Sequence, residues 1–335
     1  MQLTLRPKEL TELLIAAFAK KLKVLIKGAP GIGKTDIVKA ACAAIGASVI
    51  FMHPAVSDPT DFKGMPAVTD NGTAAHFLPF GDLQALIDAT ALTIAFIDDI
   101  GQAPHAVQAA LMQLLQERRV NGHKISDHVV FCGATNDTKH KAGVQGLLEP
   151  VKSRWHTIVE LVPTVEDWCA WASGPGDMPP ELVGFIKFKP DMLNKWVATR
   201  ELTNSPCPRT VSAVGDWVKA GVTTHAVLAG AAGEAFAIEF AAFLRLYKSL
   251  PTVESILANP THALLPNEIA TQCAISSALI RRFDAKNSPA IFTYAARMTK
   301  EAEVCLVRDA LRAKKEIATF PGFTRWMEQN AEVFQ

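Results

Sequence analysis

The chain has 335 residues, of which 49% are hydrophobic and 20% are charged, a balance typical of a globular protein with two or three domains and a substantial core. The formal net charge of +1 excludes a strong overall positive field of the kind that attracts nucleic acid. The six cysteines are scattered without a C-x-x-C pair, a pattern that fits buried thiols in a reducing compartment better than a disulfide framework or a zinc site.

The first predicted elements are a helix over 7–20, a strand over 24–26 and a helix over 36–44. Residues 28–35 read GAPGIGKT, a complete phosphate-binding loop between a strand and a helix. Its glycines let successive amide N–H groups converge on phosphate oxygens, and the helix N-terminus adds partial positive charge. We expect Lys34 to reach the β- and γ-phosphates and Thr35 to bind Mg²⁺. The predicted nucleotide-binding residues are Gly28, Ala29, Pro30, Gly31, Ile32, Gly33, Lys34, Thr35 and Asp36.

The next segment combines a second strand, over 48–53, with an irregular region. Residues 54–81 are rich in Pro, Gly, Asp and Thr and contain a short alternating stretch. This pattern predicts a loop carrying a small hairpin within 65–80, with Asp-Asn-Gly at 70–72 as its turn. A helix follows over 82–89.

Two acidic residues end the next strand. Residues 93–97 form an apolar run, as expected of a buried parallel strand, and Asp98 and Asp99 follow directly. A strand of this kind delivers carboxylates to the C-terminal edge of the sheet, beside the phosphate loop. We expect Asp98 to hold the Mg²⁺ shell and Asp99 to orient or deprotonate the attacking water.

A further apolar strand ends in a polar pair. After a helix over 104–117, residues 129–136 read VVFCGATN. A carboxamide both donates and accepts hydrogen bonds, so Asn136 is a candidate contact for the γ-phosphate or the lytic water. With a fifth strand over 157–161, strands alternating with helices predict a parallel α/β sheet.

The pattern changes near residue 163, after which all segments are predicted to be helix or loop. Phenylalanines at helical spacing within 227–250 indicate a buried helix face. The most apolar segment, 226–243, is interrupted by two glutamates and is too short to span a bilayer. The first ten residues lack the apolar core of a secretion signal. We therefore expect a cytoplasmic protein without a membrane segment.

The order of these motifs resembles that of AAA+ ATPases, and more narrowly that of the MoxR branch. The stretch 97–120, IDDIGQAPHAVQAALMQLLQERRV, is close to that family's signature around its second nucleotide motif. The stretch 58–64, DPTDFKG, and the hairpin after it match the family's insertion in the second helix. The resemblance covers about residues 5–220 and implies an AAA+ core over 1–163 with its insert at about 54–81, an all-α lid over 164–225 and a helical extension over 226–335.

The resemblance also implies two functional arginines. Arg154, in LLEPVKSRW at 147–155, stands where the family has its arginine finger, which reaches the nucleotide of a neighbouring subunit. Arg209, in PCPRT at 206–210, resembles the second sensor in the lid. Arg118 and Arg119 remain open between the subunit interface and a solvated helix end.

One position departs from the family pattern, because Asp99 replaces the usual glutamate. Its side chain is one methylene shorter, which is compatible with slow turnover, and activity is still expected because an acid is kept and every other part is present. The family resemblance implies ATP and Mg²⁺ as cofactors, a homo-oligomeric, hexameric ring, and remodelling of a client, often with a von Willebrand factor A domain protein as a separate chain. The alternatives are a nucleic-acid motor such as a restriction-type translocase, against which the near-neutral charge counts, and a slow nucleotide-gated scaffold.

Overall fold

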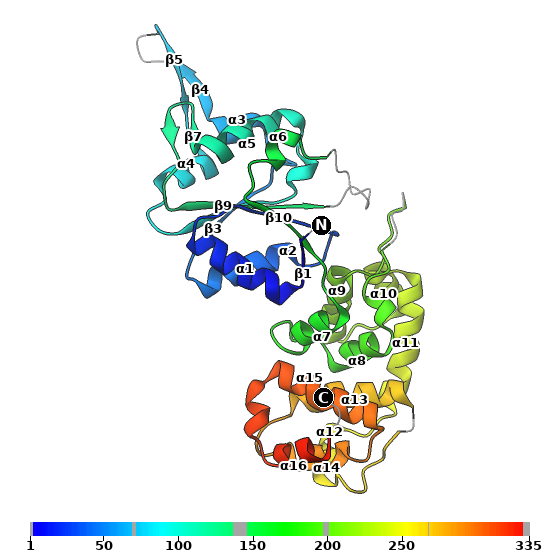
Figure 1. The fold of residues 1–335 in the computed structure, drawn as a ribbon. Helices are drawn as coiled ribbons and strands as arrows, with labels where there is room; N and C mark the ends of the chain where they lie inside the picture. The colour runs from blue at the N-terminus through cyan, green and yellow to red at the C-terminus, as the bar shows by residue number, and fades with distance from the viewer. Residues whose placement is uncertain (1–2, 69–71, 137–145, 197–200, 267, 331–335) are drawn as a thin grey trace. The chain divides into compact units, whose positions relative to one another are not determined.

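The chain forms two compact units, Met1–Pro163 and Thr164–Gln335 (Figure 1). The computed structural model describes residues 3–68, 72–136, 146–196, 201–266 and 268–330.

A parallel sheet of six strands forms the centre of the first unit, in the order β1-β10-β2-β9-β6-β3. This confirms the α/β prediction, and each of the five predicted strands is present. The additional strand, β1, is a three-residue edge strand, too short to produce a periodic pattern in the sequence. The strands are β1 (Leu3–Leu5), β2 (Val24–Gly28), β3 (Ser48–Met52), β6 (Thr93–Ile97), β9 (Val129–Asn136) and β10 (Thr157–Leu161).

Helices cover both faces of this sheet (Figure 1). In β6, which lies between β9 and β3, Ile94 and Phe96 join the core on one face, while Ala95 and Ile97 join the core on the other. This alternation follows from the two-residue period of a strand, and it explains why β6 is apolar throughout. One face is covered by α1 (Pro7–Ala19) and α2 (Lys34–Ala44), the other by α3 (Pro59–Lys63), α4 (Gly81–Asp88), the 3₁₀ turn η1 (Ile100–Gln102), α5 (His105–Glu117) and α6 (Glu149–Lys152).

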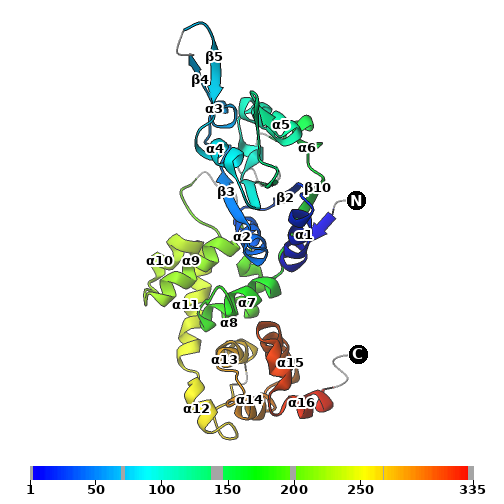
Figure 2. The same cartoon turned by 90° about the vertical axis from the view of Figure 1, so that its left-hand side faces the viewer.

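The predicted hairpin is present as β4 (Met65–Val68) paired with β5 (Ala75–Leu78), and it projects from the first unit (Figure 2). Of its predicted turn at 70–72, residues 70 and 71 lie outside the described part of the chain. A second hairpin, β7 (Arg119–Val120) paired with β8 (His123–Lys124), contacts the first. Its His123 Nε2 lies 2.9 Å from the Phe77 carbonyl oxygen.

The second unit is helical in its described residues. One core joins α7 to α11 and includes Ala274 of α13, and a second joins α12 to α16. Phe236, Phe240 and Phe243 are buried around Phe185, as their spacing predicted. The division placed at residue 225 falls within the first core, and it stays a prediction.

The helices of the second unit are α7 (Val165–Ser173), α8 (Pro180–Phe188), α9 (Pro208–Lys219), α10 (His225–Ala232), α11 (Glu234–Lys248), α12 (Val253–Ala258), α13 (Ile269–Arg281), α14 (Ser288–Ala295), α15 (Lys300–Ala313) and α16 (Phe323–Gln329), with 3₁₀ turns η3 (Pro190–Leu193) and η4 (Lys315–Thr319). Within the described ranges, none of the helices has the length and apolar character that crossing a membrane requires.

The cysteines differ in accessibility. Cys42, Cys132, Cys169 and Cys207 are buried, as the scattered pattern predicted. Desolvation raises the pKa of the Cys42 thiol to about 11. Cys305 is exposed on α15, so the expectation of buried thiols was wrong there.

Candidate nucleotide site

The phosphate-binding loop connects the end of β2 to the start of α2. Gly31 and Gly33 have positive φ angles of 74° and 91°, which side chains rarely adopt, and Gly33 is the N-cap of α2. Gly28 differs, because its φ is not positive. A Cβ there would lie 2.7 Å from Ile32 Cδ1 and 3.2 Å from the Leu161 carbonyl oxygen. Gly28 is therefore needed for close packing and not, as predicted, for its backbone angles.

Lys34 is the most tightly held polar residue of the loop. Its side chain is buried, and Nζ donates to the carbonyl oxygens of Gly28 at 3.2 Å and Ala29 at 2.9 Å. Nζ also donates to Asn136 Oδ1 at 2.7 Å. The register explains this contact, because Gly28 of β2 pairs with Asn136 of β9. The ammonium group thus lies where the ends of two parallel strands meet.

Thr35 and Asp98 meet at the same edge of the sheet. Thr35 Oγ1 donates a hydrogen bond to Asp98 Oδ2 at 3.0 Å, although the residues are 63 positions apart. A hydroxyl beside a carboxylate supplies the hard oxygen ligands that Mg²⁺ prefers, and Mg²⁺ in nucleotide sites takes its other ligands from phosphate and water. Among the described residues no cluster of three or more His, Cys, Asp or Glu side chains could hold a metal alone. The pair therefore fits a metal that arrives with a phosphate.

Asp99 has a left-handed backbone conformation, with φ 53° and ψ 33°. Such angles are uncommon for residues other than glycine, although Asp tolerates them better than most, and they are found disproportionately at functional sites. The Asp99 amide donates to Asp98 Oδ1 at 2.9 Å. Asp99 Oδ1 accepts from Asn136 Nδ2 at 2.9 Å, so the shorter acid still reaches the end of β9.

Asn136 therefore bridges a cation and an anion. Its carbonyl oxygen faces the Lys34 ammonium and its amide nitrogen faces the Asp99 carboxylate. This is the orientation that the two charges require, because Lys only donates and an ionised carboxylate only accepts. The structure thus brings together Lys34, Asn136 and Asp99 in one chain of hydrogen bonds, with Thr35 and Asp98 beside them.

Arg154 lies after α6 and is held by backbone carbonyls. Its Nε donates to the Met112 oxygen of α5 at 3.1 Å, and its Nη1 donates to the Pro150 oxygen. Among the described residues of the same chain, it makes no hydrogen bond to Lys34, Asp98 or Asp99. Its predicted role in a neighbouring subunit stays a prediction.

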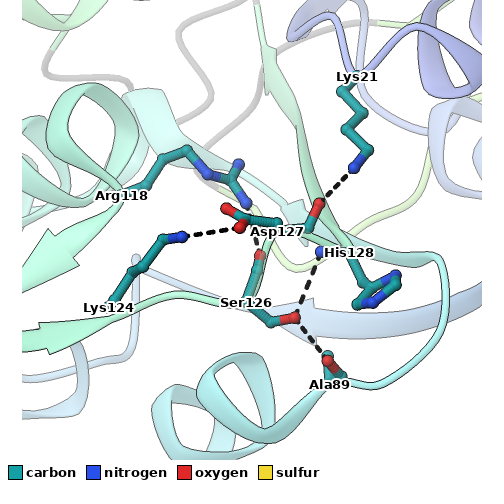
Figure 3. A network of polar contacts seen from close by, with 7 residues as sticks. All are labelled: Lys21, Ala89, Arg118, Lys124, Ser126, Asp127 and His128. Atoms are coloured by element: carbon teal, nitrogen blue, oxygen red, sulfur yellow. Dashed lines mark hydrogen bonds and ion pairs between the residues drawn. The ribbon is translucent and has the colours of Figure 1, made fainter.

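Arg118 is not a solvated helix end, and its alternative place at a subunit interface stays a prediction. It ends α5 in a left-handed conformation, and its Nη2 donates to the Ser126 carbonyl oxygen at 2.6 Å (Figure 3). The guanidinium lies 5.8 Å from the centre of the Phe131 ring, and partial burial lowers the pKa of Arg118. It is therefore not a solvated helix end, and its contacts support the segment before β9. Arg119 is exposed.

The same segment is held from two other directions. Lys21 Nζ donates to the Asp127 carbonyl oxygen at 2.7 Å, and Lys124 pairs with the Asp127 carboxylate at 2.7 Å (Figure 3). The two bonds meet at Asp127, two residues before β9 begins at Val129. They anchor the start of the strand that delivers Asn136 at its far end.

Arg209 lies in the first turn of α9 in the second unit, where its side chain is exposed. Its role as a nucleotide sensor stays a prediction.

Sequence reasoning gave no role to Gln108, which is fully buried in the first unit. A signal for it was available, because the other buried positions of α5, including Val107, Leu111 and Leu114, form an apolar stripe that Gln108 interrupts.

Comparison with known proteins gives one family match. Residues 23–155 match the family described as AAA domain (dynein-related subfamily). No curated protein matches the chain.

Solved structures add distant likenesses. A mutant of RuvB from Thermotoga maritima is 18% identical, with 76% of this chain and 75% of that chain covered and a TM-score of 0.44. RuvB from the same organism, described as a Holliday junction branch migration motor, is 17% identical over 76% of this chain and 75% of that chain, with a TM-score of 0.40. NtrX from Brucella abortus is 15% identical over 90% of this chain and 67% of that chain, with a TM-score of 0.38.

The family match and the fold agree on the same part of the chain. The matched residues begin just before β2 and end just after Arg154, so they include the phosphate-binding loop, both acidic residues and Asn136. The first unit has the AAA+ P-loop fold, and residues 23–155 within it are similar to AAA domains of the dynein-related subfamily.

Proposed function

We propose that the protein is an AAA+ ATPase of the MoxR type that hydrolyses ATP in a ring to remodel a client protein. The observation that carries the proposal is the hydrogen-bonded set at the C-terminal edge of the sheet. Lys34, Asn136 and Asp99 form one connected chain, and Thr35 bonds Asp98 beside it. A cation, a hydroxyl, two carboxylates and a carboxamide converge there at the end of a phosphate-binding loop.

Each of these side chains has a task in hydrolysis. The loop amides and Lys34 bind the phosphates and neutralise their charge. Thr35 and Asp98 would hold Mg²⁺, which offsets negative charge on the phosphate oxygens when bound. Asp99 accepts a proton from the attacking water or orients it, and Asn136 holds the Asp99 carboxylate by donating to Oδ1. The left-handed backbone at Asp99 orients the shorter side chain toward Asn136.

The ring is proposed from Arg154 and from the family resemblance. A guanidinium that acts on a phosphate must come within hydrogen-bond distance of it, and the Arg154 bonds in this chain go to the backbone of α5 and α6. A neighbouring copy would receive the guanidinium at its own nucleotide. The resemblance to the MoxR branch supports the hexamer, the client and the separate von Willebrand factor A domain partner.

Hydrolysis is tested with Asp99→Asn. This change keeps the size and the hydrogen-bonding capacity of the side chain but removes its basicity. We expect ATP to bind within a few-fold of the wild-type affinity and phosphate release to fall by about 100-fold or more, the range for removal of a general base. The matched control is Asp88→Asn, which removes an exposed carboxylate at the end of α4 in the same unit and should leave phosphate release unchanged. Unchanged phosphate release in Asp99→Asn would remove Asp99 from the mechanism.

The ring and the trans arginine are tested by mixing two inactive variants. Arg154→Ala keeps an intact nucleotide site, and Lys34→Ala keeps an intact Arg154. Random mixing in equal amounts places an intact site beside an intact arginine at about a quarter of the contacts, so about a quarter of the wild-type turnover should return. No recovery would refute a trans arginine.

ATPase activity that rises with DNA and falls with salt would favour the nucleic-acid motor over a protein client.

A further inference from the structure

We propose that Gln108 is a positioning residue that holds the segment carrying Arg154 in register with the acidic end of β6. This inference rests on the proposed function, because it assigns Gln108 a role that acts through the trans arginine. Gln108 lies in α5 and is fully buried, yet its side chain makes three hydrogen bonds to backbone atoms of two other segments.

The first of these segments leads from the acidic strand into α5. Gln108 Nε2 donates to the Ala103 carbonyl oxygen at 3.1 Å. Ala103 follows the turn η1, which begins directly after Asp99. The amide group is therefore anchored to the chain that leaves the acidic end of β6.

The second segment leads into α6. Gln108 Nε2 also donates to the Gly146 carbonyl oxygen at 3.0 Å, and its Oε1 accepts from the Leu148 amide at 3.0 Å. These two bonds hold residues 146–148 at both ends, through the Gly146 carbonyl oxygen and the Leu148 amide. Leu148 is the N-cap of α6, and Arg154 follows α6 by two residues. A single buried side chain thus connects the two functional segments of the domain.

Arg154 is also bonded directly to α5, the helix that carries Gln108. The Met112 carbonyl oxygen, one helical turn after Gln108, accepts from Arg154 Nε at 3.1 Å. Next to Arg154, the ring of Trp155 fills the space above Gly133 of β9. Arg154 is therefore oriented by α5 and by the packing of Trp155 on the sheet, and Gln108 bonds both Ala103, directly after η1, and the segment before α6.

Simple core filling does not account for Gln108. The apolar stripe of α5 would accept a leucine or methionine at this position, and burying an amide costs free energy unless its hydrogen bonds are made. The Gln108 amide donates two hydrogen bonds and accepts one, and a hydrocarbon side chain could make none of them. Such a group fixes the relation between two segments, because loss of a bond leaves a buried or partly buried backbone group without this partner.

The test uses Gln108→Met, which keeps the volume and removes all three hydrogen bonds. We expect ATP affinity of the variant to stay within about three-fold of wild type, since no loop residue is touched. Turnover should fall by about 10- to 100-fold, because a displacement near 1 Å of a catalytic group has effects of that size. Loss of ATP binding together with turnover would instead mean a general structural role.

The decisive measurement is again a mixture. Gln108→Met subunits keep their own nucleotide sites, because Thr35 and Asn136 hold Asp98 and Asp99 without Gln108, and Lys34→Ala subunits supply correctly placed Arg154. An equal mixture should recover about a quarter of wild-type turnover, as for Arg154→Ala, since random mixing gives that share of productive contacts. If Arg154→Ala is rescued by Lys34→Ala and Gln108→Met is not, the inference fails while the proposed function stands. If neither is rescued, the trans arginine itself fails.

Two further variants separate positioning from folding. Gln272→Met removes a buried glutamine of the second unit that bonds the Pro266 carbonyl oxygen at 2.8 Å and the Thr299 amide at 3.2 Å. Gln272→Met should lower thermal stability, as Gln108→Met should, but it should not cause a turnover defect that mixing with Lys34→Ala subunits corrects.

Gln108→Glu keeps the acceptor for the Leu148 amide, and protonation restores one donor. Its turnover relative to wild type should rise as pH falls, because burial raises the pKa of a carboxyl group. A pH-independent ratio would contradict the role of the donated bonds.

Discussion

The substitution Gly133→Ala tests how the segment after Arg154 is packed. Gly133 lies in the central strand β9, and a Cβ built there would lie 2.7 Å from Trp155 Cη2 and 2.9 Å from Cζ2. It would also lie 3.1 Å from Leu25 Cδ1. The Trp155 ring is buried against the sheet, so the contact cannot be relieved by moving the ring into solvent.

The expected change is a net loss of stability. Overpacking of a well-packed core costs about 1–3 kcal/mol. Replacing glycine by alanine also reduces the entropy of the unfolded chain, which favours the folded state by about 0.4–1 kcal/mol. The upper half of the overpacking range, about 2–3 kcal/mol, applies because two atoms of a buried ring would lie within 3.0 Å of the added Cβ. The free energy of unfolding should therefore fall by about 1–2.6 kcal/mol, and the displaced Trp155 should shift Arg154 and lower turnover.

Urea denaturation followed by circular dichroism measures this change. The matched control is Gly230→Ala in α10, where a Cβ meets no atom within 4 Å and the φ angle is ordinary, so that stability should rise slightly. Trp155→Phe removes the outer ring atoms, and in the double variant the cost of Gly133→Ala should largely disappear. The reasoning is refuted if Gly133→Ala is as neutral as Gly230→Ala, or if its cost is the same with phenylalanine at 155.

Two other outcomes follow from the described contacts. Asn136→Ala removes the hydrogen bonds to Lys34 and Asp99. Since bonds to charged groups are worth about 1.5–3 kcal/mol each, phosphate release should fall by about 100-fold. The control Asn121→Ala, in the β7–β8 hairpin, should leave phosphate release unchanged, and equal rates in the two variants would exclude the bridge from catalysis. A thiol reagent at pH 8 should label exposed Cys305 first and spare Cys42, whose raised pKa of about 11 leaves little thiolate; a fast phase that persists in Cys305→Ser would contradict this order.

The sequence by itself determined the central sheet and the chemistry of its edge. An apolar strand, a glycine-rich loop and a helix must follow one another locally, so GAPGIGKT could be interpreted without tertiary information. Apolar runs that end in Asp98 and in Asn136 placed both side chains at the same edge, because parallel strands all end there. The hairpin and the buried phenylalanines were equally local, as each depends on spacing over a few residues.

Only the tertiary structure decided which atoms meet. The partners of Lys34, Asp99 and Gln108 include groups 37 to 102 residues away, and their distances depend on strand register and helix packing. The same holds for Gly28, whose role depends on Ile32 and on Leu161 in a neighbouring strand. A residue's type states which bonds it is able to make, whereas the packing of elements distant in the chain selects the ones that form.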